Sequence, residues 1–343
     1  MLAALYRGSP QLTIEDWPRP VPGPGELLVR VAACGICHTD LHYLDHGVPT
    51  FKKPPLVLGH EISGTVAGGA AGVKNFREGD RVLIPAVLTC GQCHLCRSGR
   101  ENICEAMRML GNHVDGGFAE WVVAPAKDCF PVPNEIPLDD ASIIADAVST
   151  PYHAVKHRAQ VRTGSVVAVF GCGGVGMNVV QCAVAAGGRV IAVDLDPKKL
   201  ELAGKLGAAL TVNPKDVERV DKELKKITGG GCDIAIEAIG KPETIRLAYE
   251  SVRRGGRVCV IGYSAEEVTL AVSKLMFYEL EMVGSLGCRP VDYPEIIELV
   301  RIGRLQLAPI ITGRIPLERI NDGFDALRQG CALRTIVLPA PAS

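Results

Sequence analysis

Alternating apolar and polar residues predict short strands in the first 147 positions of this 343-residue chain. The clearest alternation runs over 26–31 and over 81–84, and proline and glycine, as in the run 21–25, interrupt the apolar segments. Short strands separated by turn residues are typical of a β-rich, barrel-like domain.

From about residue 148 the pattern changes to apolar strands that alternate with helical segments. The expected strands are 165–170, 189–194, 232–237 and 257–261, and the expected helices include 174–186 and 197–206. Such alternation indicates parallel βαβ units. After about residue 289, a helix at 294–302 leads back to short strands that end near Val337.

These patterns predict an α/β protein with two domains, a number that the chain length also favours. The β-rich domain is expected to comprise 1–147 and 289–343, and residues 148–288 are expected to form a doubly wound parallel sheet.

Charge and composition exclude several classes of protein. The chain has 37 basic and 38 acidic side chains. Because a nucleic-acid binder needs a basic surplus, we expect no nucleic-acid partner. No apolar run has the length of a membrane span, and charges and prolines in the first twenty residues exclude a secretory signal. We expect a cytoplasmic protein without membrane contact.

Thirteen cysteines, an odd number without an export signal, argue against a disulfide framework and for metal or redox chemistry. Four of them follow one another at short spacings: Cys90, Cys93, Cys96 and Cys104. Four thiolates satisfy the tetrahedral geometry of a closed zinc site, and an iron–sulfur cluster or a redox pair are the alternatives. We predict a structural zinc lobe.

A glycine motif at 171–176 follows an expected strand and opens an expected helix, which is the context that dinucleotide binding requires. Asp194 comes 18 positions after Gly176, where a carboxylate would accept from both ribose hydroxyls and repel a 2′-phosphate. This carboxylate favours NAD over NADP. The alternative interpretation of the glycine motif is a turn that binds no phosphate. The cofactor-binding candidates in this part of the chain are Gly171, Gly173, Gly174, Val175, Gly176, Asp194, Leu195, Lys199 and Ile261.

Thiols, imidazoles and a hydroxyl also gather in residues 34–42, and a Gly-His-Glu triplet occupies 59–61. A single histidine here would more often be a satisfied polar residue than a ligand. Together, and beside a nicotinamide site, these groups indicate an open catalytic zinc site.

The chain resembles the zinc-dependent medium-chain alcohol dehydrogenases over essentially its whole length. The resemblance rests on the segments 34–40, 59–61 and 116–120, on the four cysteines, and on the glycine motif with Asp194. It implies a GroES-like catalytic domain, a Rossmann domain, NAD as cofactor, two zinc ions per subunit, and a homotetramer or homodimer.

The same resemblance assigns roles around the catalytic zinc. The resemblance implies that Cys37 and His60 are zinc ligands. It also implies that the carboxylates of Glu61 and Asp40 adjust the zinc and orient the residues around it. Cys34 is not a ligand in the family.

Other implied roles concern the proton and the cofactor. Thr39 is implied to face the substrate oxygen, and His42 to be the outer end of a proton relay through the nicotinamide ribose. His38 and Arg334 are implied to lie near the pyrophosphate.

The third zinc ligand departs from the family pattern. The family usually has a cysteine just before its Thr-x-Tyr segment, and the corresponding stretch 145–152 has Asp146 at that position. A carboxylate is a competent zinc ligand with the same charge as a thiolate. The alternative is that Asp146 hydrogen-bonds a water and zinc is weakly held or absent. The presence of Cys37 and His60 favours ligation.

The segments 47–50, 53–55, 111–112 and 145–152 resemble the 6-hydroxycyclohex-1-ene-1-carbonyl-CoA dehydrogenases, which are NAD enzymes that oxidise a ring alcohol on a CoA thioester. We predict reversible oxidation of a secondary or cyclic alcohol to a ketone, with hydride transfer to NAD. This CoA thioester is a candidate substrate.

Two other classes stay open. A zinc-independent medium-chain enone or quinone reductase would have little use for Cys37, His60 and the four cysteines. A non-catalytic NAD-binding regulatory protein would keep the glycine motif but would need no relay of Thr39 and His42.

Overall fold

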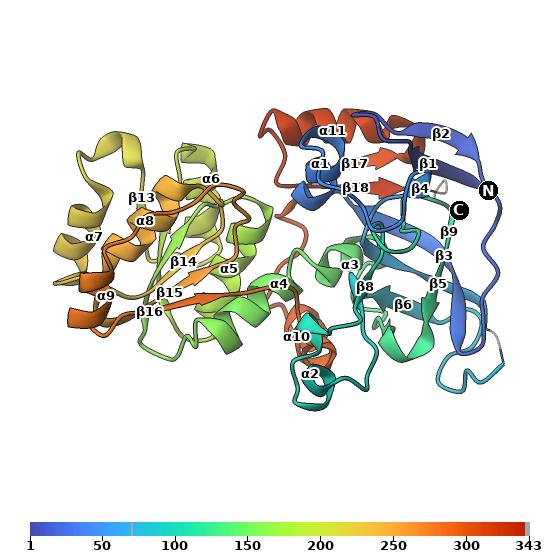
Figure 1. The fold of residues 1–343 in the computed structure, drawn as a ribbon, viewed down its shortest axis with the longest axis horizontal. Coiled ribbons are helices and arrows are strands. Elements are labelled where there is room, and N and C mark those ends of the chain that lie inside the picture. Colours follow the sequence, from blue (N-terminus) through green and yellow to red (C-terminus); the bar gives the residue numbers. More distant parts are fainter. Residues whose placement is uncertain (70, 340–343) are drawn as a thin grey trace. The chain divides into compact units, whose positions relative to one another are not determined.

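The computed structural model describes residues 1–69 and 71–339. The chain forms two compact units (Figure 1): unit 1 comprises Met1–Ser149 and Gly287–Ser343, and unit 2 comprises Thr150–Leu286. The boundaries predicted from the sequence, 147/148 and 288/289, each differ from these by two residues. Residues 340–343 of the expected last stretch lie outside the described residues.

Unit 1 is built on a seven-stranded sheet with the order β10-β6-β5-β3-β18-β17, and β9 also pairs with β3. A three-stranded sheet, β2-β1-β4, and the pair β7-β8 complete its strands. The strands are β1 Leu2–Tyr6, β2 Thr13–Asp16, β3 Glu26–Gly35, β4 Leu56–Val57, β5 Glu61–Gly69, β6 Arg81–Ile84, β7 Val87–Leu88, β8 Arg108–Met109, β9 Trp121–Pro125, β10 Phe130–Pro131, β17 Ile311–Pro316 and β18 Arg334–Leu338. The helices are α1 His38–Asp45, α2 His94–Arg97, α3 Leu138–Ala141, α10 Tyr293–Arg301 and α11 Ile320–Arg328, and α4 Ser149–His153 crosses the boundary between the units.

Strand β3 is longer than the alternation over 26–31 predicts. Its pairing with β5 continues to Gly35 through two register shifts. Leu27 and Val29 are fully buried in the core of unit 1, which also contains Phe118 packed edge-on against Phe324. The extension matters because the register sets Gly35 opposite Glu61.

Unit 2 is a six-stranded sheet with the order β13-β12-β11-β14-β15-β16, and every pair in it is parallel. The strands are β11 Val166–Phe170, β12 Arg189–Val193, β13 Leu210–Val212, β14 Cys232–Glu237, β15 Val252–Val260 and β16 Glu281–Gly284. The helices are α5 Gly174–Ala185, α6 Pro197–Lys205, α7 Val220–Thr228, α8 Pro242–Ser251 and α9 Val272–Phe277. The predicted fold class is confirmed.

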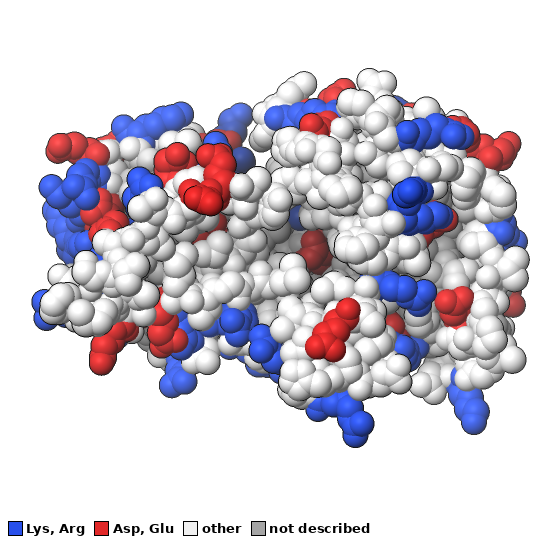
Figure 2. Space-filling model, viewed as in Figure 1, with Lys and Arg blue, Asp and Glu red and all other residues white. Residues whose placement is uncertain are grey.

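The charged surface agrees with the small net charge. Basic and acidic side chains are interspersed over the face drawn in Figure 2. Within residues 1–69 and 71–339, no helix combines the length and apolar character that a membrane crossing needs.

Candidate active site and metal centres

The pairing of β3 with β5 brings Cys37 and His60 together. Gly35, the last residue of β3, lies opposite Glu61, the first residue of β5. Cys37 follows β3 by two residues and His60 directly precedes β5, so both residues are at the same end of the strand pair. Two motifs that are distant in sequence therefore converge through sheet register.

Asp40 lies beside the ring of His60, on the side of Nδ1. Its Oδ2 accepts the backbone N–H of Cys37 at 3.1 Å at the start of α1, and its Oδ1 lies 3.5 Å from Nδ1 of His60. Both side chains are buried. A carboxylate behind one imidazole nitrogen leaves the other nitrogen directed at a metal, an arrangement common in zinc sites.

Asp146 places a third candidate ligand atom beside those of Cys37 and His60. Its Oδ2 lies 3.7 Å from Sγ of Cys37 and 3.7 Å from Nε2 of His60. A tetrahedral zinc with these atom types has ligand–ligand distances of roughly 3.3–3.7 Å. The side chain of Asp146 is 20% exposed and that of His60 is 1% exposed. The three side chains are therefore largely shielded from solvent, which reaches them beside Asp146.

Glu61 and Arg334 form an ion pair behind this set. Glu61 is fully buried, and its Oε1 lies 3.3 Å from Nη1 of Arg334, which donates to the carbonyl of Ile36 at 2.8 Å. Burial raises the pKa of Glu61 to about 7, although Arg334 acts in the opposite direction. The contact predicted between Arg334 and the pyrophosphate stays a prediction.

The chemistry of this cluster fits a divalent cation. The ligand atoms of Cys37, His60, Glu61 and Asp146 lie within 4.8 Å of one another. Among the described residues, both ring nitrogens of His60 and both carboxylate oxygens of Glu61 are buried without a hydrogen bond. Burial alone would lower the pKa of His60, but Asp40 and Asp146 raise it well above its usual value. Buried acidic groups around a sulfur and a nitrogen ligand suit zinc.

Thr39 and His42 lie on α1 beside this cluster. Oγ1 of Thr39 is 3.6 Å from Sγ of Cys37. His42 is three residues further on, so the two side chains lie on the same side of the helix. Nδ1 of His42 lies 3.0 Å from Nδ1 of His46, and burial together with His46 lowers the pKa of His42. His38 is exposed at the first position of α1.

The four cysteines also converge. Their sulfur atoms lie within 4.8 Å of one another, with 3.8 Å between those of Cys90 and Cys96 and 3.9 Å between those of Cys93 and Cys104. A zinc with four sulfur ligands has edges of about 3.8 Å. Backbone N–H groups of Gln92 and Cys93 point at Sγ of Cys90 and lower its pKa to about 6. The lobe is shaped for a tetrahedral metal.

The glycine motif has the geometry that a pyrophosphate needs. Gly171 has a φ of +92°, and α5 begins directly after Gly173. A Cβ at Gly176 would lie 1.8 Å from the carbonyl oxygen of Gly171, whereas a Cβ at Gly173 would meet no heavy atom within 4 Å. Glycines have three roles in this motif: they form the tight turn, they let the helix pack closely on the strand, and they leave the backbone open to the pyrophosphate. Gly174 and Val175 form the first turn of α5.

Asp194 lies one residue beyond its strand rather than at its end, since β12 stops at Val193. Its Oδ2 accepts the N–H of Cys172 at 2.7 Å, and its Oδ1 accepts the N–H of Asp196 at 2.9 Å. A carboxylate has further lone pairs, so ribose hydroxyls remain possible donors. Leu195 is exposed and Lys199 is half-buried on α6.

Comparison with known proteins agrees with both parts of this geometry. Residues 23–134 match the alcohol dehydrogenase GroES-like domain, and residues 174–301 match the zinc-binding dehydrogenase domain. The chain belongs to the zinc-dependent medium-chain alcohol dehydrogenases. The predicted family is confirmed, and the chain is an oxidoreductase of this type that uses zinc and a nicotinamide dinucleotide.

Alignments with named relatives cover nearly the whole chain. An alcohol dehydrogenase of Geobacillus stearothermophilus is 36% identical over 95% of this chain and 96% of its own. A sorbitol dehydrogenase of Bacillus subtilis is 33% identical over 96% of this chain and 94% of its own. The crystal structure of the alcohol dehydrogenase from Aeropyrum pernix matches with a TM-score of 0.90 and 32% identity, covering 99% of this chain and 100% of that one.

Sequence reasoning missed Glu237, the last residue of β14, in this alcohol dehydrogenase. Its buried Oε1 accepts the N–H groups of Ile239 and Gly240, each at 2.9 Å, and the hydroxyl of Thr244 at 2.7 Å. A Cβ at Gly262 would lie 2.2 Å from the nitrogen of Gly240, so the loops after β14 and β15 touch there. The signal in the sequence was a single carboxylate at the end of an apolar strand.

The N–H of Ile261, a predicted cofactor contact, is bonded to the carbonyl of Glu237 at 2.8 Å. This places Ile261 at the carboxyl edge of the sheet, where dinucleotides bind in doubly wound folds. Its contact with the cofactor stays a prediction.

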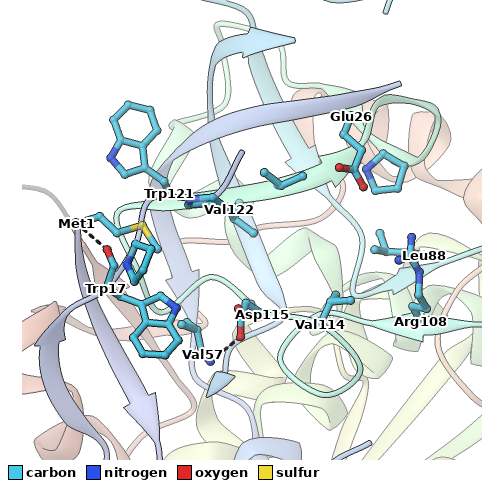
Figure 3. A pocket seen from close by; sticks show the side chains of 15 residues that line it. Met1, Trp17, Glu26, Val57, Leu88, Arg108, Val114, Asp115, Trp121 and Val122 are labelled. Atoms are coloured by element: carbon cyan, nitrogen blue, oxygen red, sulfur yellow. Dashed lines mark hydrogen bonds between the residues drawn. The ribbon is translucent and has the colours of Figure 1, made fainter. Parts of the chain in front are cut away.

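A separate hollow in unit 1 is not the catalytic site. It has a volume of about 210 Å³, and both tryptophans of the chain, Trp17 and Trp121, line it (Figure 3). Its acidic groups have partners: Asp115 accepts the N–H of Val57 at 3.1 Å, and Glu26 accepts a backbone N–H at 2.8 Å. The residues that line it include no candidate zinc or cofactor residue.

Proposed function

We propose that this alcohol dehydrogenase oxidises a secondary or cyclic alcohol to a ketone, reversibly and with NAD, at a zinc held by Cys37, His60 and Asp146. The observation that carries the proposal is the convergence of these three ligand atoms within 4.8 Å, with the hydroxyl of Thr39 beside them. A second zinc at the four cysteines holds the lobe together.

Each bound group has a defined contribution. Zinc, when bound, supplies a Lewis acid that lowers the pKa of the alcohol, and NAD supplies the hydride acceptor. The chain itself positions and moves the proton. Thr39 hydrogen-bonds the substrate oxygen, and His42 is neutral near pH 7 because its pKa is lowered, so it can accept the proton that leaves.

The proposed preference for NAD rests on Asp194. Its carboxylate is fixed by two backbone N–H groups, one of them in the glycine motif. A fixed negative charge at this place accepts hydrogen bonds from ribose hydroxyls and repels a 2′-phosphate.

A cyclic acyl-CoA alcohol is the substrate that we propose for the first test. Asn112 belongs to one of the segments that carry the resemblance to the CoA-linked enzymes, and its Oδ1 accepts the N–H of Phe51 at 2.9 Å, in the short stretch between the segments 47–50 and 53–55. Nδ2 of Asn112 donates to the hydroxyl of Tyr43 on α1 at 2.7 Å. The ring of Phe51 is 77% exposed and stacks on His113 at 4.1 Å, which provides an aromatic surface for a ring or an adenine.

A homodimer or homotetramer is part of the proposal. Strand β16 pairs only with β15 among the described strands, and Met282 on it is exposed. Val272, Met276 and Phe277 of α9 are exposed apolar residues in the same unit. An unpaired strand edge together with exposed apolar side chains favours pairing with a second copy.

Variants of Asp146 test the proposed zinc ligand. Asp146→Ala should lower zinc from two ions to one per chain and reduce kcat/KM by at least 10²-fold, because the third ligand is lost. Asp146→Cys keeps the charge and should retain both ions. Elemental analysis and turnover of cyclic alcohols, read as NADH absorbance, provide the measurements. Two ions and near-normal turnover in Asp146→Ala would show that the ligand is elsewhere, with Glu61 the first residue to examine.

Zinc stoichiometry and a substrate screen of the unaltered protein separate the other two classes. We expect two ions per chain. An enone or quinone reductase would hold none or one, and a regulatory NAD-binding protein would show no turnover in a screen that includes cyclic alcohols and their CoA thioesters.

A further inference from the structure

The backbone at Asp146 is irregular, so its position needs support from elsewhere in the fold. Asp146 has φ −143° and ψ −55°, between a 3-10 helix at Ser142–Ala145 and α4, which begins at Ser149. A residue outside both helices receives little orientation from helical hydrogen bonds. The peptide before Asp146 is the point where it can be fixed.

Two hydroxyl groups hold that peptide. The carbonyl of Ala145 accepts from the hydroxyl of Tyr293 at 2.8 Å and from Oγ of Ser149 at 3.0 Å. The two hydroxyl oxygens lie 3.2 Å apart, and Ala145, Ser149 and Tyr293 are all buried. Hydrogen bonds in such a buried group are costly to break, because a hydroxyl or carbonyl that loses its partner there has no water to replace it.

Tyr293 is itself fixed. Its ring stacks on Phe130 with 5.0 Å between the ring centroids and 14° between the planes. It is the first residue of α10, and the residue before it, Asp292, accepts from Nε and Nη2 of Arg289, each at 2.9 Å. The hydroxyl of Tyr293 therefore has a defined position from which to hold Ala145.

We propose that Tyr293 is a positioning residue for Asp146 and sets the place of its carboxylate relative to Cys37 and His60. This inference rests on the proposed function, because it takes Asp146 as the third metal ligand. A carboxylate reaches a metal through one more rotatable bond than a thiolate does, so it has more conformational freedom to lose on binding, and a fixed peptide limits that freedom. Partners behind a ligand commonly change metal affinity by 10- to 100-fold.

The test replaces zinc by cobalt(II), whose visible absorption reports the geometry of its ligands. Asp146→Asn first identifies the part of the spectrum that belongs to this site. Tyr293→Phe removes one oxygen and keeps the ring on Phe130. Tyr249→Phe is the matched control, because Tyr249 is also buried and donates to a carbonyl, that of Ala271, at 2.7 Å in unit 2.

We expect Tyr293→Phe to shift the cobalt bands that Asp146→Asn identifies and to speed the release of this one ion to a chelator by about ten-fold. Tyr249→Phe should leave both unchanged. If Tyr293→Phe fails to fold, Ser149→Ala removes the other hydroxyl from the same carbonyl and is read in the same way.

Two results overturn the inference and are distinct. In the first, Asp146→Asn alters the cobalt spectrum, but Tyr293→Phe leaves the bands and the rate of ion release unchanged, as the control Tyr249→Phe does. Asp146 then remains the ligand, and Tyr293 does not position it. If Asp146→Asn leaves the spectrum unchanged, the proposed ligand fails, and the role of Tyr293 fails with it.

Discussion

At the scale of single residues, the carboxylate at position 146 is the most consequential feature of the site. It keeps the charge of the usual thiolate but is a harder ligand, and its Oδ2 lies 3.7 Å from both Cys37 and His60. Harder ligands favour harder metals. The proposed centre should therefore exchange zinc for cobalt or manganese more readily than a centre with two thiolates.

His42 should act in proton transfer. Its pKa is lowered, so it is neutral near pH 7, and activity should fall as the pH drops through that lowered pKa. His42→Ala should reduce kcat at pH 7 by about 10²-fold and recover at higher pH, where solvent base accepts the proton. A pH–rate profile provides the measurement. A profile of unchanged shape in His42→Ala would remove it from the relay.

Asp194 should determine the choice of cofactor. Hydrogen bonds to a charged group contribute about 1.5–3 kcal/mol, so Asp194→Gly should weaken NAD binding by roughly ten- to a hundred-fold. Combined with Leu195→Arg, it should improve NADP. The kcat/KM ratio for the two cofactors measures the effect, and Leu195→Arg alone is the control. A native preference for NADP would show that the ribose assignment is wrong.

At the scale of elements, local patterns predicted the segments that carry motifs. Helices α5 and α6 begin at the expected positions, because the glycine and Asp-Pro signals at their starts are local, and they end one residue before the expected positions. Strands β13 and β16 were not predicted; they are short edge strands that carry exposed residues. The extension of β3 was also missed, because its last residues depend on pairing with β5.

The same distinction between local patterns and contacts made only in the fold holds for the site. The cysteine spacing and the glycine motif lie in continuous segments, so the sequence reveals them. The pairs Arg334–Glu61 and Tyr293–Ala145 join residues that only the finished fold brings together. No local pattern indicates such partners.

The four-cysteine lobe should stabilise the fold when it holds metal. Its sulfur atoms surround a common point, and α2 within it has only four residues. Cys93→Ser should lose one zinc per chain and lower Tm by several degrees, at about 2–4 °C per kcal/mol for a unit of this size. Calorimetry with elemental analysis provides the measurement, and Cys331→Ser, at an exposed cysteine, is the control. Loss of one zinc with an unchanged Tm would contradict a structural role.

At the scale of the whole molecule, self-association should depend on unit 2. Phe277 and Met282 are exposed there, on α9 and on the edge strand β16. Phe277→Asp with Met282→Lys should convert the oligomer into smaller species, because charge disfavours edge pairing. Sedimentation velocity measures this, with Val291→Lys as an exposed apolar control in unit 1. An unchanged sedimentation coefficient would place the interface elsewhere.

The position of β18 has a consequence for the newly made chain. This strand lies between β3 and β17, and it carries Arg334, the partner of Glu61. Synthesis runs from residue 1 onward, so Cys37, His60 and Asp146 leave the ribosome before unit 2, and Arg334 leaves after it. The inserted unit can reach its parallel sheet while the surrounding unit still lacks two strands. The nascent protein can therefore complete its cofactor unit before its catalytic unit, and the cation that balances Glu61 is among the last groups to arrive.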